Sequence, residues 1–405
     1  MELEEVLKHG IDWLAYSDIR IKDPTSPFYG AYCNFYDLRT RSYPLIYCEI
    51  TGYALQFWLR LYQWRGEDLF LDMAKDAGEF LLRAQEKDGC LKGAFPYGFI
   101  LPSGNKIEKY YSFDTGICLA ALIDLYQITR EDKYLNGAIA AGEWLITMQN
   151  QDGSFVAVIS REDNGRDGLP IIEGWFGDGS CLHAKNGIGF LKLYKILKSE
   201  KFLNLAERTL DWIVALQNPD GSFRANIKEN YIFTHAHCYT LEGLLYAYSI
   251  LGSKSYLDPL IRGGRWLISK QNKDGSLYKY YGQDIKAYLR KAPYRRKFLR
   301  RFLRPRDTGP VAQTLRIWLS LYYIIGDKTF WDRASKAIDS LLSMQVLNRR
   351  DRNTFGGFFA SVEKYGYFNR YSPLLSPWEC MFICHAIIIL QFRDPVGKEQ
   401  VWEIF

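Results

Sequence analysis

The sequence has few of the features that mark a specialised class of protein. Its 405 residues include only five His and eight Cys, and no Cys-x-x-Cys pair occurs. The cysteines stand singly, mostly inside apolar helical patterns such as Ile117-Cys118-Leu119. Isolated cysteines of this kind indicate reduced thiols, so we expect a cytoplasmic protein without a resident cofactor or metal.

Long apolar runs are also missing. The longest, Met381–Leu390, is interrupted by His385 and is too short to span a bilayer. Three of the first five residues are glutamates, so we expect no signal peptide. The apolar run therefore predicts a buried core helix.

Hydrophobic residues make up 48% of the chain and charged residues 24%, which is typical of a folded globular protein. The length fits two or three average domains or one large fold. Aromatic residues reach 16%, with 29 Tyr and 11 Trp. This excess indicates dense helix packing or a ligand-binding cavity.

A Gln-x-x-Asp-Gly turn recurs along the chain. Four copies begin at Gln85, Gln149, Gln217 and Gln271, and a degraded fifth combines Gln345 with Gly356-Gly357. The spacing of roughly 54 to 68 residues suits a helical hairpin with its loops. Asp-Gly favours a tight turn with a positive φ, so each copy is predicted to end one helix and start a short extended segment.

Two kinds of helix are predicted around these turns. Amphipathic patterns before each turn indicate outer helices at Phe70–Leu82, Tyr134–Leu145, Phe202–Leu216, Tyr256–Ile268 and Phe330–Leu342. More uniformly apolar stretches indicate inner helices at about 49–64, 113–128, 181–197, 236–251, 309–325 and 377–392. The first helix, about 2–15, lacks an inner partner next to it in sequence, and the last lacks an outer one. Pairing these two closes a ring.

Twelve helices in six inner/outer pairs predict an all-α fold, an (α/α)6 toroid that occupies residues 1–405 as one domain. The Gln-x-x-Asp-Gly-Ser-Phe turns resemble the repeats of the prenyltransferase and squalene-cyclase superfamily. Six-hairpin glycosidases share the same toroid, so the expected fold is the same for both groups. Fold alone does not fix function.

In such a ring the starts of the inner helices and the loops before them converge on one funnel. The acids, imidazoles and rings at these starts are predicted to bind substrate: Tyr111, Asp114, Trp175, Asp178, His183, His235, His237, Asp307, Trp378 and Glu379. Asp114 and Asp307 also suit helix capping, which would give them a purely structural role. Further tyrosines in the predicted loops favour a glycan, because aromatic rings stack on sugar faces while acids bind hydroxyl groups. We expect an enzyme that acts on acidic or lipid-linked glycans.

A local motif gives a sharper resemblance. Phe35-Tyr36-Asp37-Leu38-Arg39-Thr40, followed by Tyr47 and Glu49, is similar to a motif of the D-glucuronyl C5-epimerases. That resemblance implies catalytic roles for Tyr36, Arg39, Tyr47, Glu49 and Tyr371. In the family the motif lies near the C-terminus, so a circularly permuted ring is implied here.

The resemblance implies removal of the C5 proton of a uronate. Arg39 would clamp the carboxylate and stabilise the enediolate, and Tyr47 would act opposite Tyr371 or Glu49. With a leaving group at C4 the same groups would form a lyase.

Three other functions stay open. A glycoside hydrolase would use two of the carboxyl groups of Glu49, Asp114, Asp178, Asp307 and Glu379. A non-catalytic ring would only bind glycans. A prenyltransferase or cyclase-like enzyme is disfavoured, because the chain has no Asp-x-Asp-Asp sequence and its candidate zinc ligands have no motif spacing: Cys181, His183, His237, Cys238, Cys384 and His385.

Residues 284–306 form a basic insertion before the fifth inner helix. Ten Lys or Arg and no acidic residue lie between Lys286 and Arg306, so the rest of the chain carries 42 basic against 46 acidic residues. A basic face with an apolar stripe indicates an amphipathic helix that contacts a polyanionic glycan or an anionic membrane through 290–305, at the inner membrane face. Nucleic acid is disfavoured. The predicted contacts are Arg295, Arg296, Phe298, Arg300, Arg301 and Phe302.

Overall fold

The computed structural model describes residues 2–160, 177–226, 231–282, 305–365 and 368–391. Within these residues, helices dominate. Six amphipathic helices form an outer layer: α1 (Leu3–Tyr16), α3 (Asp68–Ala84), α5 (Asp132–Met148), α7 (Glu200–Ala215), α9 (Lys254–Lys270) and α12 (Lys328–Leu342). Six more buried helices form an inner layer: α2 (Cys48–Arg65), α4 (Ser112–Thr129), α6 (Ala184–Leu197), α8 (Thr234–Leu251), α11 (Thr308–Ile325) and α13 (Pro377–Gln391).

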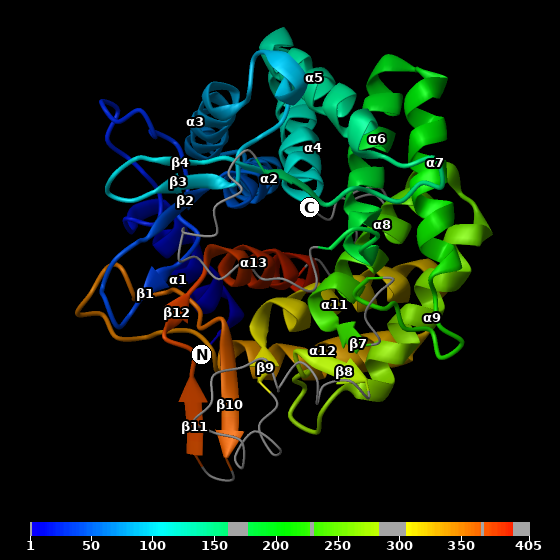
Figure 1. Ribbon diagram of the computed structural model, residues 1–405. Helices are drawn as coiled ribbons and strands as arrows, with labels where there is room; N and C mark the ends of the chain where they lie inside the picture. The colour runs from blue at the N-terminus through cyan, green and yellow to red at the C-terminus, as the bar shows by residue number, and fades with distance from the viewer. Residues whose placement is uncertain (1, 161–176, 227–230, 283–304, 366–367, 392–405) are drawn as a thin grey trace, which may run out of the picture.

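The inner helices form a closed ring. Each contacts the next in the order α2, α4, α6, α8, α11 and α13, and α13 contacts α2 again. The N-terminal helix α1 packs on the C-terminal helix α13 (Figure 1), where Gly10 leaves room for the sulfur of Cys384. The predicted toroid is confirmed, and the contacts of α13 with α1 and with α2 agree with the predicted closure.

Burial explains why the inner helices have a nearly uniform apolar sequence whereas the outer helices are amphipathic. On α4 the residues from Ser112 to Leu125 are buried on every side, because neighbours surround an inner helix. On α3 only one stripe is buried, including Phe70, Met73 and Phe80, because the opposite face meets water.

A repeated turn joins each outer helix to the next. Gly153 has a φ of 94°, and a Cβ there would lie 2.2 Å from the carbonyl oxygen of Arg208 on α7. Only glycine fits such a position. Equivalent glycines press on the next outer helix at six places around the ring: Gly30, Gly93, Gly153, Gly221, Gly275 and Gly356.

Two of these turns differ from the sequence prediction. The first predicted copy, Asp88-Gly89, leads instead into a short 3-10 helix, Gly89–Leu91, and the glycine that reaches the next outer helix is Gly93. The turn at Gly30 was not predicted, because it carries neither the glutamine nor the Asp-Gly pair.

The repeated glutamine fastens these turns. Gln217 donates hydrogen bonds to the carbonyl oxygens of Gly221, in its own turn, and of Pro259 on α9. Gln345 does the same with Gly356 and with Val6 on α1, so the degraded copy joins the end of the chain to its beginning. The other three side chains likewise reach the next outer helix: Gln85, Gln149 and Gln271.

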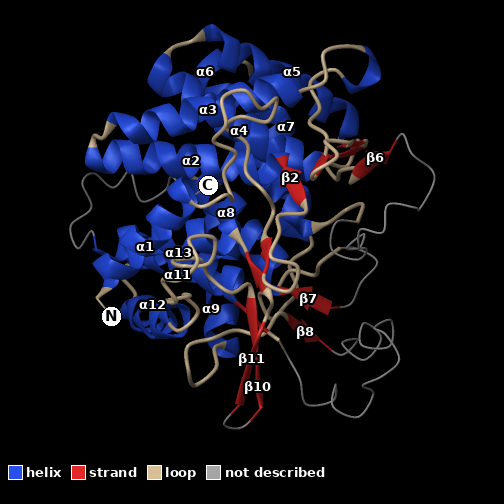
Figure 2. Cartoon of the chain, turned by 90° about the vertical axis from the view of Figure 1, so that its left-hand side faces the viewer, coloured by secondary structure: helices blue, strands red, loops and turns tan. Residues whose placement is uncertain are grey.

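Short strands gather on one side of the ring, at the N-terminal ends of the inner helices (Figure 2). Five of them directly precede an inner helix: β2 (Leu45–Tyr47), β5 (Lys109–Tyr111), β7 (Tyr231–Phe233), β9 (Arg306–Asp307) and β12 (Leu374–Leu375). Their partners are β3 (Gly98–Ile100), β6 (Val158–Ser160), β8 (Tyr280–Gly282), β10 (Ser361–Tyr365) and β1 (Tyr36–Asp37), while β4 (Lys106–Ile107) extends β3 and β11 (Phe368–Tyr371) extends β10. All pairs are antiparallel, for example Tyr110 opposite Ile159. The strands therefore fix the inner-helix starts around one mouth. None of the described helices is long and apolar enough to cross a membrane.

Candidate active site

Two carboxyl groups lie buried at the mouth of the ring, on neighbouring inner helices. Glu49 is the second residue of α2 and Asp114 the third of α4, and neither is exposed. Within the described residues, none of their four carboxyl oxygens accepts a well-formed hydrogen bond. Neither side chain caps its helix, so the capping role considered for Asp114 does not apply. We call these two residues the acid pair.

Burial raises the pKa of both members of the acid pair well above the usual range. The negative charge of Asp114 raises the pKa of Glu49 further, whereas the nearby Tyr47 hydroxyl lowers the pKa of both groups by favouring their charged forms. Burial is the largest influence, so the protonated acid is the favoured form.

A second pair of acids lies at the starts of α11 and α13, and α13 contacts α2, the helix that carries Glu49. Glu379 is 8% exposed and its Oε2 has no partner among the described residues. Burial, reinforced by the charge of Asp307, raises the pKa of Glu379 to about 8. Asp307 occupies the N-cap position of α11 without a capping bond and lies 3.6 Å from the ammonium of Lys279. We call Asp307 and Glu379 the second pair.

Aromatic rings connect the two pairs. The ring of Tyr47 lies 4.4 Å from that of Tyr97 and 5.9 Å from that of Trp378, measured between centroids. Trp378 also meets His235 at 6.2 Å, and Tyr97 meets Tyr111 at 5.7 Å. Tyr97, Tyr111 and Trp378 are partly exposed, so these rings form the wall between the acids and solvent.

His235 is the imidazole that joins this group. Burial lowers its pKa to about 3, and the positive charge of Lys279 lowers it further, so the ring is neutral at physiological pH. Its ring packs 4.4 Å from Tyr239. A neutral imidazole here offers hydrogen bonds without adding charge.

Below the acid pair, the axis of the ring holds a buried ionic cluster. Glu242 Oε2 lies 3.1 Å from Lys185 Nζ and its Oε1 lies 2.5 Å from Arg316 Nη2. Arg316 Nη1 lies 3.2 Å from His385 Nδ1. We call these four residues the charge layer. Sequence reasoning named His385 only as a candidate zinc ligand and missed Lys185, Glu242 and Arg316, although a charged residue at the centre of a nearly uniform apolar helix is the signal that marks them.

Three of the five predicted catalytic residues lie away from the acid pair. Arg39 is mostly exposed, and its guanidinium donates to both carboxylate oxygens of Asp37, at 3.0 and 2.6 Å. Tyr36 packs on Tyr43, and Tyr371 stacks on Phe359 with 37% of its surface exposed. The structure therefore places Tyr47 beside Glu49, whereas the Arg39 guanidinium binds Asp37, and the role of Arg39 as a carboxylate clamp stays a prediction.

Other predicted binding residues also have structural contacts. His237 Nδ1 accepts the backbone N–H of Phe223 at 3.2 Å, and its Nε2 lies 3.3 Å from the carbonyl oxygen of Gly263. Asp178 accepts the backbone N–H of Ala157 at 2.8 Å. His183 is buried against Phe155, and burial lowers its pKa to about 4. These contacts brace loops at the mouth.

The remaining predicted residues lie outside the described residues. They are Trp175, Arg295, Arg296, Phe298, Arg300, Arg301 and Phe302. Among the residues that are described, no group of three or more His, Cys, Asp or Glu side chains is placed to hold a metal ion.

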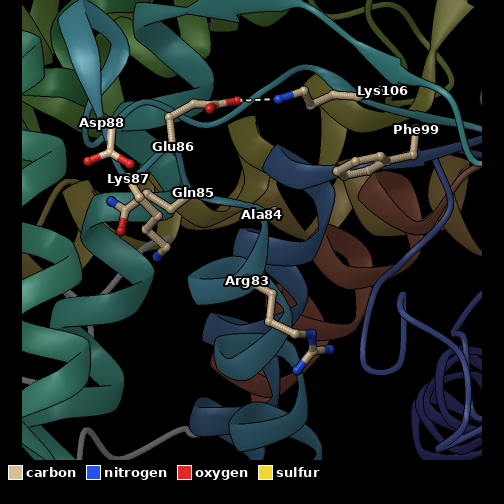
Figure 3. A pocket seen from close by; sticks show the side chains of 8 residues that line it. All are labelled: Arg83, Ala84, Gln85, Glu86, Lys87, Asp88, Phe99 and Lys106. Carbon is tan, nitrogen blue, oxygen red and sulfur yellow. Dashed lines mark hydrogen bonds and ion pairs between the residues drawn. The ribbon is translucent and has the colours of Figure 1, made fainter.

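A surface groove of about 470 Å³ lies outside the mouth, beside the end of α3 (Figure 3). Its most prominent contact is the ion pair between Glu86 and Lys106, at 2.6 Å. It contains none of the predicted site residues. The 3-10 helix that lengthens the first repeated turn begins next to it, at Gly89.

Comparison with known proteins agrees with the fold. The sequence matches no family profile. One relative, the uncharacterized protein B0495.5 of Caenorhabditis elegans, is 26% identical over 160 residues, which is 39% of this chain and 22% of the length of that protein.

Solved structures match over nearly the whole chain. A sugar epimerase from a ruminal bacterium has a TM-score of 0.74 at 15% identity and covers 97% of this chain and 100% of its own. The chain has the fold of these enzymes. A cellobiose 2-epimerase from Bacillus thermoamylovorans has a TM-score of 0.72 at 15% identity over 96% of this chain and 98% of its own. An unsaturated glucuronyl hydrolase specific for heparin has a TM-score of 0.66 at 12% identity over 96% of both chains. At such identities the likeness shows the fold alone.

Proposed function

We propose that this chain is a carbohydrate-active enzyme that moves a proton at a sugar carbon, with C5 of a uronate as the favoured position. The observation that carries the proposal is the placement of the acid pair and the second pair, of which Glu49, Asp114 and Glu379 are buried, at the starts of inner helices. Tyr47, next to the acid pair, and His235, next to Glu379, both contact the ring of Trp378, at 5.9 and 6.2 Å between centroids. Two proton-transfer groups on different sides of a substrate are what inversion at carbon requires.

The acid pair would stabilise the intermediate. Removing a proton next to a carboxylate or carbonyl group places negative charge on oxygen. A carboxylic acid that stays protonated in a buried site donates a strong hydrogen bond to such an oxygen. The raised pKa of Glu49 and of Asp114 favours that form. This role replaces the one expected of Arg39, whose guanidinium is occupied by Asp37.

Glu379 would act as the base. A carboxylate with a pKa of about 8 is more basic than an ordinary one, and its value lies close to physiological pH, where general bases work best. Glu379 would remove the proton, and Tyr47 or Glu49 would return one from the other side. A leaving group at the next carbon would turn the same steps into elimination.

A second candidate is glycoside hydrolysis. The interaction between Glu49 and Asp114 favours it, because one negative charge raises the pKa of the other group and so separates an acid from a base. Solved structures with this fold include one named for epimerisation, a sugar epimerase, and one named for hydrolysis, a heparin-specific glucuronyl hydrolase.

Incubation with uronate-containing oligosaccharides in deuterated water tests the proposal. Epimerisation predicts deuterium at C5 without cleavage of the chain, and elimination predicts an unsaturated end. New reducing ends without deuterium at carbon would support hydrolysis instead. Binding without any of these products would mark a non-catalytic glycan-binding ring and would overturn the proposal.

A further inference from the structure

Gly309, the second residue of α11, differs from the other glycines of the described α-helices. At each of those glycines a Cβ would meet a neighbouring atom within 3.3 Å, as Gly116 does with Asn186 at 2.2 Å. Close helix packing therefore explains them. At Gly309 the nearest atoms to a Cβ would be Glu379 Oε1 at 3.4 Å and His235 Cε1 at 3.6 Å, which are ordinary contact distances. Packing within the protein does not require glycine here.

The backbone offers one reason for the glycine. Pro310 follows it, and a Cβ on the residue before proline crowds the proline ring in the helical region. Against this, glycine destabilises a helix relative to alanine. A test must therefore separate the steric effect of Pro310 on the backbone from the effect of the space that the missing Cβ leaves.

The surroundings of that space indicate a ligand. Glu379 is more than nine-tenths buried, its carboxyl end faces the missing Cβ, and its Oε2 has no partner within the described residues. The neutral imidazole of His235 faces the same position. A carboxyl group so placed binds a partner when the site is occupied, because an unpaired buried carboxyl group is costly.

We propose that Gly309 is a specificity-determining residue, against whose Cα the reacting sugar ring lies, between His235 and Glu379. The C–H groups of one face of a pyranose would contact the glycine, while hydroxyl groups bind the imidazole and the carboxyl group. A methyl group at this position would occupy that space. The inference rests on the proposed function and adds to it the place of the sugar and the residue that admits it.

Three variants test it against the wild-type protein: Pro310→Ala, Gly309→Ala with Pro310→Ala, and Gly309→Ala alone. In the Pro310→Ala background the proline no longer restricts residue 309. We expect the kcat/KM of Pro310→Ala to stay within about threefold of the wild-type value. Relative to Pro310→Ala, we expect the double variant to lose about 10- to 100-fold in kcat/KM while its Tm is unchanged or higher. Gly187→Ala, which adds a methyl group on α6 at 3.1 Å from Leu210, is the control for a glycine required by packing and should lower Tm without lowering kcat/KM.

A double variant with the activity of Pro310→Ala would overturn the role of Gly309. If the double variant does not fold, Gly309→Ala alone is compared with the wild type, and undiminished kcat/KM in that variant also refutes the role. Failure of the proposed function is distinct, since it appears in the wild type itself as no turnover of any uronate oligosaccharide, whether or not the oligosaccharide binds.

Discussion

The charge layer and the acid pair, both buried near the ring axis, differ in whether their carboxyl groups have partners. In the charge layer, Glu242 is bonded to both Lys185 and Arg316. At the mouth, Glu49 and Asp114 are equally buried but have no well-formed hydrogen bond among the described residues. Burial without a partner costs free energy that the fold does not recover by itself. The comparison indicates that the deep layer supports the structure, and it supports the ligand site that we propose at the mouth.

Breaking the charge layer should have the largest effect. Glu242→Ala leaves two buried cations without their shared carboxylate, so we expect a loss of about 3–5 kcal/mol in the free energy of unfolding. Urea denaturation followed by tryptophan fluorescence measures it. A loss below about 1 kcal/mol would contradict the structural role of this layer.

A substitution in the acid pair should lower activity rather than stability. Glu49→Gln removes a proton donor but keeps the shape and the neutral form of the group, so we expect kcat/KM to fall by about 100-fold or more with little change in Tm. Activity on a uronate oligosaccharide and a thermal melt measure both. Undiminished activity in this variant would remove Glu49 from the proposed mechanism.

Glu379 should give the mouth a measurable pH dependence. Its pKa is about 8 in the folded protein against 4.5 for the free side chain, so the folded state binds the extra proton between these values. Stability from this group is therefore full below about pH 4.5 and falls as the pH rises to about 8, by up to roughly 1.4 kcal/mol per pH unit.

Glu379→Gln should flatten that decline relative to the wild type, in urea denaturation at a series of pH values. Glu363→Gln, on the rim strand β10, is the control and should leave the slope as it is. Equal slopes in the wild type and Glu379→Gln would show that the carboxyl group titrates normally.

Arg39 should give the smallest effect. Its ion pair with Asp37 is exposed on the guanidinium side, and exposed pairs contribute little. We expect Arg39→Ala to leave Tm unchanged and kcat/KM within about threefold. A large loss of activity, with Lys8→Ala as an unaffected control, would restore the carboxylate clamp that the C5-epimerase motif implies.

Much of the architecture was predictable from the sequence because it rests on local signals. The turn at Gly153 combines a glutamine, an aspartate and a glycine whose separate preferences agree, and the apolar pattern of α4 follows from its central position. The turn at Gly30 escaped notice because it keeps only the glycine. Its role depends on the backbone of α3, which no local pattern describes.

The site was only partly predictable for the same reason. The position of Glu49 at an inner-helix start indicated the mouth correctly, as did that of Trp378. The environment of a side chain is not local, however. The sequence suggested a functional role for His237, but both of its ring nitrogens contact backbone groups. The sequence likewise suggested that Arg39 binds a substrate carboxylate, but its guanidinium binds the neighbouring Asp37. Three-dimensional contacts decide which polar residue keeps its hydrogen-bonding capacity for a ligand.

The glutamine of each turn reaches forward to the next helical hairpin, and Gln345 reaches α1. Each helical hairpin is therefore held by a hydrogen bond to the next hairpin, and the last is held to the first helix. A solenoid tolerates the loss of a repeat because its end units are capped, but a ring has no end to remove. Evolution can lengthen the loops at the mouth freely while the number of hairpins stays fixed. Such a chain would change its substrate far more readily than its shape.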